Sequence, residues 1–167
     1  MTVKKFAKEL HKDQKWNIYP YEYHLYRVVE KLDQIIYTSS ISLEEELKQT
    51  LIDAAWCHDT LEDCNISYND LKKVVGEKVA DIVYDVTNEL GKNRKERNER
   101  TYPKIRKNWA ATIVKIADRM ANSEGPLFDM YKSEFPSFKE GIYNSYWKND
   151  PLYKNAWNLL EKMYEKK

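Results

Sequence analysis

Residues 47–64 read Leu47-Lys-Gln-Thr-Leu-Ile-Asp-Ala-Ala-Trp-Cys-His-Asp-Thr-Leu-Glu-Asp-Cys64. Leu47, Leu51 and Ala54 recur at helical spacing, which predicts a helix with an apolar stripe facing a core. One turn further on, polar and charged groups replace Leu or Val on the inward side: His58, Asp59, Glu62 and Asp63. These groups are three or four residues apart, so we expect them to share one face of the last helical turn.

Three carboxylates and an imidazole crowded on an inward face would repel one another and lose hydration. Such groups are rarely buried without a compensating partner, and a divalent cation is the simplest one. Two further candidates lie on core-facing stripes elsewhere, His24 and Asp118, and Asn122 follows Asp118 by one turn. Taken alone, His24 is more typical of a satisfied core residue than of a ligand, whereas Asp118 fits a hydrogen-bonded pair near a helix end as well as it fits a ligand. Taken together with His58 and Asp59, they predict a metal site.

The composition is that of an ordinary folded domain. The chain has 167 residues, 28 basic against 27 acidic, so its charge favours neither a nucleic-acid nor a membrane partner. No apolar run approaches the ~20 residues of a membrane span, and the first residues lack the apolar region of a signal peptide. Cys57 and Cys64 form no CxxC pair. We therefore expect one domain over residues 1–167 in a reduced, cytoplasmic protein.

The apolar spacing predicts an all-α fold without strands. Ser42 and Glu45 resemble a capping box for the central helix, Ser67 and Asp70 cap the next one, and Gly91 has the position of a C′ glycine. Residues 13–20 are expected to form a loop. Helices are predicted over residues 2–12, 21–37, 43–64, 68–75, 77–90 and 109–122, with two or three more in the tail, the last one starting at Asp150-Pro151.

Three segments in this order resemble the motifs of a known family. Tyr19-Pro-Tyr-Glu-Tyr-His24 is similar to PYxxH, Ala55-Trp-Cys-His-Asp-Thr-Leu-Glu-Asp63 to HDxxED, and Val114-Lys-Ile-Ala-Asp-Arg-Met-Ala-Asn122 to KxADxxxN. The chain thus resembles the HD phosphohydrolases, and among them the hydrolase domain of RelA/SpoT proteins and the small alarmone hydrolases of the metazoan SpoT homologue type. This implies an HD-type helical bundle, with the motifs in residues 1–135 and further helices in 136–167.

The resemblance also implies functions for individual residues. It implies that one manganese ion per chain is held by His24, His58, Asp59 and Asp118. Two imidazoles and two carboxylates suit a borderline divalent metal such as Mn, Fe or Co. The resemblance further implies that Glu62 and Asp63 orient or deprotonate the attacking water, and that Asn122 contacts the sugar or base of a nucleotide.

A basic segment, residues 92–107, lies between two elements that carry these motifs. Taken singly, the basic residues of 91–100 fit a solvated surface loop. Taken as a group, they suit a di- or triphosphate, and the resemblance to the family, in which a basic residue of this region meets phosphate, implies Arg94 and Arg97 for that contact. Further along, Tyr131 and Lys132 are predicted to close the pocket, with core packing as the alternative for Tyr131. The C-terminal aromatic residues are expected to pack between helices: Tyr143, Tyr146, Trp147, Tyr153 and Trp157.

One feature departs from the family pattern. The family carries an arginine that stacks on guanine about ten residues before the first histidine. This chain has His11-Lys-Asp-Gln-Lys-Trp16 there, and Lys12, Lys15 or Trp16 would have to replace it. The preference for guanine is therefore left open, with adenine alarmones as the alternative.

Three functions are consistent with these residues. The first is a metal-dependent (p)ppGpp/(p)ppApp 3′-pyrophosphohydrolase, an enzyme whose partner is a small nucleotide. The second is an HD-type nucleotidase or phosphatase, and the third is a nucleotide-binding module without catalysis. The pair Glu62 and Asp63 favours the first, because a binding module has no need of an acid/base pair. A homodimer through the C-terminal aromatic residues is an open alternative to a monomer.

Overall fold

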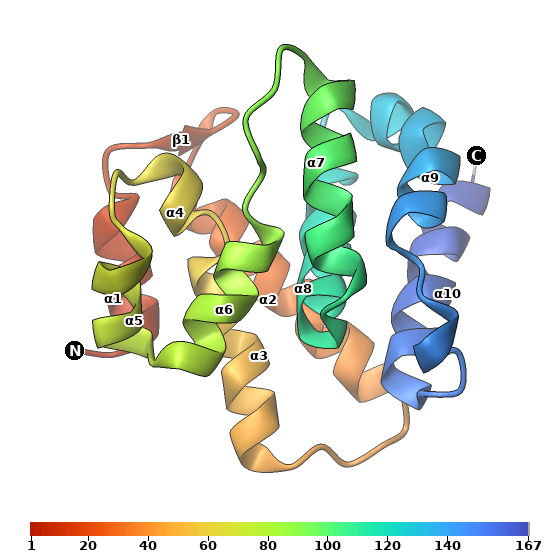
Figure 1. Cartoon of the computed structure of the whole chain (residues 1–167), viewed down its shortest axis with the longest axis horizontal. Helices are drawn as coiled ribbons and strands as arrows, with labels where there is room; N and C mark the ends of the chain where they lie inside the picture. Colours follow the sequence, from red (N-terminus) through yellow and green to blue (C-terminus); the bar gives the residue numbers. More distant parts are fainter. Residues whose placement is uncertain (167) are drawn as a thin grey trace.

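The computed structural model describes residues 1–166, and most of them are helical (Figure 1). The chain runs through α1 (Val3–Leu10), β1 (Lys15–Trp16), β2 (Tyr19–Pro20), α2 (Tyr21–Thr38), α3 (Glu45–Cys57), α4 (Thr60–Asp63), α5 (Tyr68–Val75), α6 (Glu77–Val86), α7 (Arg94–Arg106), α8 (Trp109–Asn122), α9 (Phe128–Ile142), a 3-10 turn (Ser145–Trp147) and α10 (Pro151–Glu165). The predicted all-α class is confirmed, apart from one short hairpin.

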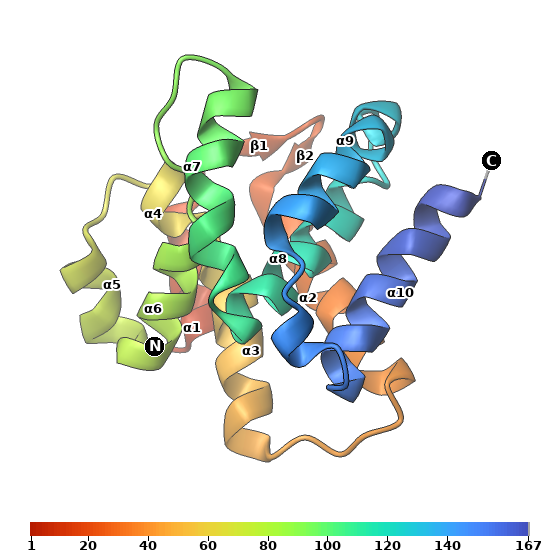
Figure 2. The same ribbon diagram turned by 45° about the vertical axis from the view of Figure 1, so that its right-hand side comes forward.

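The helices α2 and α8 form the centre of the bundle, with α3 and α10 packed against them (Figures 1 and 2). Their apolar stripes face each other and are buried, for example Leu25 and Leu32 on α2 and Ile113 and Ile116 on α8. Each fully buried side chain of this size contributes about 1.5–3 kcal/mol, so burial between α2 and α8 is a substantial part of the stability of the frame. Both helices also carry candidate site residues.

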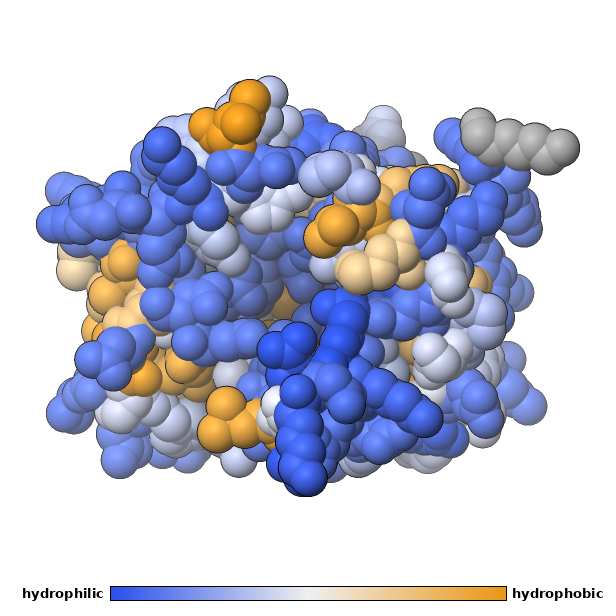
Figure 3. All heavy atoms as spheres, turned by 90° about the horizontal axis from the view of Figure 1, so that it is seen from above, coloured by the Kyte–Doolittle hydropathy of each residue, from blue (hydrophilic) through white to orange (hydrophobic). Residues whose placement is uncertain are grey.

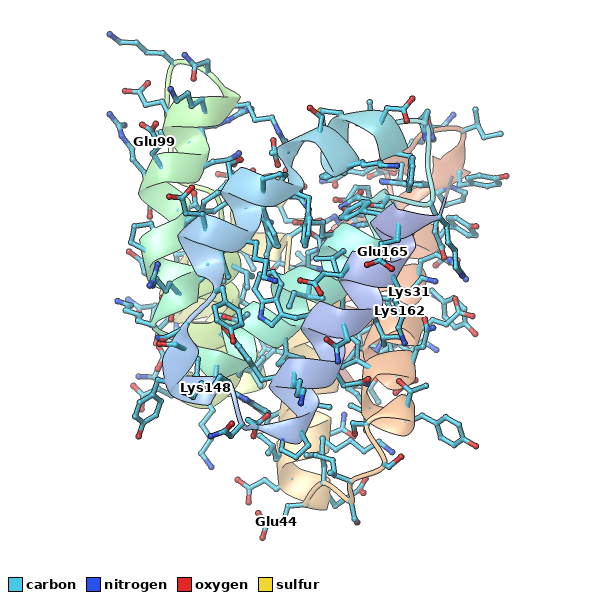
Figure 4. All side chains as sticks on the ribbon, turned by 90° about the vertical axis from the view of Figure 1, so that its right-hand side faces the viewer. Lys31, Glu44, Glu99, Lys148, Lys162 and Glu165 are labelled. Atoms are coloured by element: carbon cyan, nitrogen blue, oxygen red, sulfur yellow. The ribbon has the colours of Figure 1, made fainter. Side chains whose placement is uncertain are left out.

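The C-terminal aromatic residues pack mainly between helices, as predicted. Tyr153 and Trp157 are buried, and they contact Tyr143 and Phe138 with ring centroids 5.7–6.2 Å apart. Tyr146 is the exception, because it is 85% exposed. Charged side chains cover the outside of the bundle, where Figure 4 shows Glu44, Glu99 and Lys148. None of the helices among residues 1–166 is both long and apolar enough to cross a membrane.

Several predicted helix ends are confirmed. Ser67 and Asp70 form a reciprocal capping box at the start of α5. Gly76 separates α5 from α6 with φ of +82°, a conformation that favours glycine. Asp150 caps α10 through the Tyr153 amide, with Pro151 at the first helical position.

The structure corrects the prediction that residues 13–20 are an irregular loop. Lys15–Trp16 and Tyr19–Pro20 pair as an antiparallel hairpin, with Lys15 opposite Pro20 and Trp16 opposite Tyr19. Asn17 takes φ of 59° at the turn, which asparagine tolerates better than most residues. Strands of two residues are too short to show an alternating pattern, so the sequence offered no period from which to predict them.

The predicted continuous central helix is also wrong. Helix α3 ends at Cys57 and α4 begins at Thr60, and Asp59 lies between them with φ of −102° and ψ of 1°. The Thr60 hydroxyl donates to the Cys57 carbonyl at 2.8 Å and so satisfies one of the free acceptors at the end of α3. The helix begins at Glu45 without a side-chain cap, so Ser42 and Glu45 form no capping box.

Two further predictions, the end of α6 at Gly91 and the loop over 91–100, are also wrong. Helix α6 ends at Val86, and Leu90 is 86% exposed in the segment that follows, so Gly91 is not a C′ glycine. Gly91 lies instead against the first turns of α7, where a Cβ would stand 2.8 Å from the Arg97 amide nitrogen. The basic segment expected to be a loop is mostly helical, because Asn93 caps α7 through the Glu96 amide.

Candidate active site

A cavity of about 210 Å³ opens at the end of the bundle where the hairpin, α4 and the start of α7 meet. Figure 3 looks onto this end and shows a hollow surrounded mainly by hydrophilic residues. The lining comes from β1, α2, the α3–α4 junction, α4, the segment after α6, α7, α8 and α9. It includes Trp16, Tyr21, His24, Asp59, Glu62, Asp63, Asn88, Arg94, Asn98, Tyr102, Lys115, Asp118, Arg119, Asn122, Tyr131, Glu134 and Phe138.

The four predicted metal-binding residues lie together at one end of this cavity. His24 from α2 and His58 from the α3–α4 junction approach with their Nε2 atoms 3.3 Å apart. Asp118 Oδ1 on α8 is 3.2 Å from His24 Nε2 and 3.4 Å from His58 Nε2. Asp59 Oδ2 is 2.8 Å from His58 Nε2 and 3.7 Å from His24 Nε2. The fold therefore brings together residues separated by 94 positions at their extremes.

The donor atoms fit a single divalent cation. Ligand atoms of His24, His58 and Asp118 all lie within 4.8 Å of one another, and bonds of about 2.1 Å place the ligands of one ion about 3–4 Å apart. The Ala55 carbonyl accepts a hydrogen bond from His58 Nδ1 at 2.8 Å, so the Nε2 lone pair is directed into the group. This buried group is consistent with a divalent metal site.

Burial and charge act in opposite directions on these ligands. Burial alone lowers the pKa of His58, but Asp59 and Asp118 raise it well above its usual value. Burial raises the pKa of Asp118, yet the Lys115 ammonium and the two imidazoles hold it well below its usual value. The pKa of Asp59 is lowered because His58 outweighs the cost of burial. Both carboxylates are therefore ionised, which is the form that binds a cation.

Glu62 and Asp63 lie on α4 at the edge of the same cavity and are exposed. The Asn88 side-chain amide lies 3.2 Å from both carboxylate oxygens of Glu62. Burial, together with the charges of Asp59 and Glu62, raises the pKa of Asp63. A raised pKa makes a carboxylate a stronger base. Asp63 therefore has the properties of a proton acceptor beside the candidate metal ligands.

Two residues around the carboxylates were not identified from the sequence. The Tyr21 hydroxyl donates to Asp59 Oδ2 at 2.5 Å, and Lys115 Nζ lies 3.4 Å from Asp118 Oδ2. Lys115 stands between Val114 and Ile116 in the apolar part of α8, a pattern that can indicate a charge directed at a buried partner. Tyr21 carried no such pattern beyond its place in the PYxxH-like segment.

Asn122 lies in the cavity wall with both ends of its amide engaged. Its Nδ2 donates to Asp118 Oδ1 at 2.7 Å, and its Oδ1 accepts from Trp16 Nε1 at 3.2 Å. The Trp16 ring in turn stacks on His24 with centroids 5.5 Å apart and planes at 12°. Of the three residues predicted to replace the family's arginine, Trp16 lines the cavity, Lys12 pairs with Glu9, and Lys15 lies outside the lining.

The opposite end of the cavity is basic. Glu134 on α9 accepts from Arg94 Nε at 2.6 Å and from Arg119 Nη1 at 3.0 Å. The Tyr131 ring centroid lies 5.3 Å from the Arg94 guanidinium and 5.0 Å from that of Arg119. Arg119 is buried beside Asp118 on α8 and was not identified from the sequence, although an arginine on an inner helical face is itself unusual.

Two of the predicted substrate contacts are not brought into this cavity. Arg97 and Lys132 are exposed and absent from its lining, whereas Arg94 and Tyr131 belong to it. The prediction treated 91–100 as a loop and therefore contained no helical face by which to distinguish the two arginines.

Known proteins resemble this chain in sequence and in fold, although no family model matches it. The guanosine-3′,5′-bis(diphosphate) 3′-pyrophosphohydrolase of Aquifex aeolicus (strain VF5) is 34% identical over 123 residues, which make up 70% of this chain and 16% of that protein. The chain thus spans about a sixth of that relative's length.

Two solved structures have related folds. One, described as a metazoan orthologue of SpoT that hydrolyses ppGpp, matches with a TM-score of 0.72 and 20% identity over 98% of this chain and 92% of the other. The fold is that of an HD domain, and the predicted resemblance to RelA/SpoT hydrolases is confirmed. A protein from Listeria monocytogenes EGD-e matches with a TM-score of 0.57 and 19% identity over 86% of this chain and 94% of the other.

Proposed function

We propose that this protein is a metal-dependent 3′-pyrophosphohydrolase that releases pyrophosphate from nucleotides of the (p)ppGpp and (p)ppApp class. The observation that carries the proposal is one cavity in which His24, His58, Asp59 and Asp118 converge beside Glu62 and Asp63, opposite a cluster of basic residues. The 3′-pyrophosphohydrolase activity of the Aquifex relative and the ppGpp hydrolysis by the metazoan SpoT orthologue support the same chemistry.

His24, His58, Asp59 and Asp118 are proposed to hold one divalent cation, with manganese as the expected metal. A cation bound there lowers the pKa of water and neutralises negative charge on phosphate oxygens. The protein's own contribution is to orient these side chains: the Ala55 carbonyl holds His58, and Asn122 and Lys115 contact Asp118.

Glu62 and Asp63 are proposed to handle the attacking water. Asp63 accepts its proton because its pKa is raised, while Glu62, held by Asn88, orients it. The water oxygen forms a bond to the phosphorus attached to the nucleotide's 3′ oxygen, and the bond between that phosphorus and the 3′ oxygen breaks. The 3′ oxygen leaves with a proton from solvent or from Asp63, so the products are pyrophosphate and a nucleotide with a free 3′ hydroxyl.

The basic end of the cavity is proposed to bind the remaining phosphate groups. Arg94 and Arg119 supply two positive charges, and Glu134 is the carboxylate that contacts both of them. Lys115 adds a third positive charge to the lining, beside Asp118 at the other end. A phosphate beside Arg94 gains charge-assisted hydrogen bonds from a planar guanidinium, which suits this group well. Tyr131 packs against both guanidiniums and closes this end.

Base selectivity is proposed to be weak. Trp16 is the candidate that lines the cavity at the position of the family's stacking arginine, and its Nε1 is already bonded to Asn122. An indole ring stacks on guanine and adenine alike, because every base has a π face. We therefore propose both guanine and adenine alarmones as substrates.

Product analysis tests this function directly. The purified protein is incubated with ppGpp, ppApp or a 5′-mononucleotide, each with manganese and with a chelator. Pyrophosphate from a 3′-diphosphate, abolished by the chelator, is the expected result. Inorganic phosphate from the mononucleotide alone would instead indicate an HD-type nucleotidase. Metal binding without turnover of any substrate would indicate a binding module.

A further inference from the structure

Tyr21, the first residue of α2, contacts both groups of carboxylates in the site. Its hydroxyl donates to Asp59 Oδ2 at 2.5 Å and lies 3.4 Å from Asp63 Oδ2. Asp59 belongs to the proposed metal ligands, whereas Asp63 is the proposed proton acceptor. The phenol is thus the group through which the two carboxylates, which repel each other, are linked.

The Tyr21 ring is itself held firmly. It stacks on the buried His11 ring with centroids 4.5 Å apart and planes at 13°. His11 Nδ1 lies 2.7 Å from Gln14 Oε1, and Gln14 Nε2 donates to the Asp63 carbonyl at 2.9 Å. The Tyr21 amide donates to the Gln14 carbonyl at 3.1 Å. These contacts close a ring of four residues that ties the start of α2 to the end of α4.

We propose that Tyr21 is a positioning residue that sets the place of Asp59 toward the cation and keeps Asp63 at a fixed distance from it. The inference rests on the proposed function for the chemistry, but its geometric part concerns the cation site alone. A phenol that donates to a ligand carboxylate fixes the carboxylate's rotation and leaves its other lone pairs free to bind a cation. Partners of this kind outside the ligand set commonly change metal affinity or activity by about 10- to 100-fold.

Tyr21→Phe removes the hydroxyl and keeps the ring that stacks on His11, so it isolates the contact to the carboxylates. Tyr26→Phe is the matched control, because Tyr26 lies on the same helix, is 56% exposed and is absent from the cavity lining. Three quantities are measured for each protein: manganese affinity by competition with a metal indicator, kcat and KM for ppGpp, and the thermal midpoint of the metal-free protein.

The expected result for Tyr21→Phe is about tenfold weaker manganese affinity and about tenfold lower kcat at saturating manganese, with KM and the thermal midpoint near those of the wild type. Tyr26→Phe should match the wild type in all three. The proposal is overturned if Tyr21→Phe keeps both manganese affinity and kcat within twofold, if only KM changes, or if Tyr26→Phe loses as much. Should the wild type hydrolyse no alarmone, the proposed function fails, while the manganese comparison still supports or overturns the positioning of Asp59.

Discussion

The two ends of the cavity are built in different ways. The end that contains the proposed metal ligands is called the metal end here. Its residues His24, His58 and Asp118 lie at the buried contact of α2, α3 and α8, and backbone and short side-chain contacts set their orientation. At the basic end, Arg94 and Glu134 come from α7 and α9, and they are held together by ion pairs between long side chains.

This difference fits the two ligands: a cation site must be preformed, whereas a phosphate site can adapt to its ligand. A cation site requires its ligand atoms within a few tenths of an ångström, and core helices provide such precision because close-packed interiors deform little. Phosphate groups are bound by guanidiniums that can exchange one anionic partner for another. Glu134 accepts hydrogen bonds from both Arg94 and Arg119, and all three residues line the cavity.

The largest effect should come from the metal end. Asp59→Ala removes a proposed ligand and the acceptor of the Tyr21 hydroxyl. We expect loss of bound manganese together with at least ~10³-fold loss of kcat/KM, since metal catalysis supplies several kcal/mol. Metal content and hydrolysis of ppGpp are measured on the same preparation, with chelator-treated wild type as the reference. A variant that hydrolyses ppGpp without manganese would contradict the assignment.

Next in size are the exposed carboxylates beside the metal end. Glu62→Gln and Asp63→Asn should each lower kcat about 10²–10⁴-fold, the usual contribution of a general acid/base group, while manganese affinity stays within severalfold of the wild type. Single-turnover hydrolysis and a manganese titration separate the two quantities. Intact hydrolysis in Glu62→Gln and Asp63→Asn would show that another group accepts the proton.

The basic end should show a smaller effect, and in KM. Arg94→Ala removes a charge-assisted contact worth about 1.5–3 kcal/mol, so KM for ppGpp should rise at least about tenfold with little change in kcat. Arg97→Ala is the natural comparison, since Arg97 lies on the same helix outside the cavity lining. An equal rise in KM for both variants would restore the sequence-based prediction that both arginines contact phosphate.

The smallest effect concerns the stability of the basic end. Burial raises the pKa of Glu134, but Arg94 and Arg119 outweigh it and lower the pKa below its usual value of 4.5. A pKa lowered in the folded state stabilises the protein above pH 4.5, and the stabilisation is lost as pH falls through the folded-state value. Glu134→Gln should therefore reduce the free energy of unfolding by about 1 kcal/mol at pH 7 and by less near pH 3. Urea unfolding at both pH values measures this, and an equal loss at both would exclude a charge effect.

Much of the frame was predictable from spacing alone. The stripes Leu25–Ile36 and Ile113–Ala121 alternate with polar residues at the helical period, because one side of each helix is buried. The positions of His24, His58 and Asp118 on or beside such stripes were visible for the same reason. Boundaries were less predictable: Leu90 continues the stripe of α6 in the sequence, yet the helix ends at Val86 and Leu90 is exposed.

The contacts around the ligands depended on tertiary structure. Tyr21, Lys115, Arg119 and Glu134 act on residues from other elements or on groups whose direction depends on the packing of α8 and α9. The two-residue strands of the hairpin bring Trp16 against His24 and Asn122, a contact over 106 positions in the second case. Short-range periodicity carries no information on such pairs.

The order and spacing of apolar and polar residues sufficed to predict a helical protein and to place His58 and Asp59 at the inward end of one helix, because a helix places every third or fourth side chain on one face. The set of His24, His58, Asp59 and Asp118 came instead from the resemblance of three motifs to a known family, and only the fold brings these residues together. The break between α3 and α4, the engagement of Asn122 by Trp16, and the choice of Arg94 over Arg97 arose only when the helices packed. Each of these depends on which neighbour a side chain meets, and that is set by the arrangement of distant segments in space.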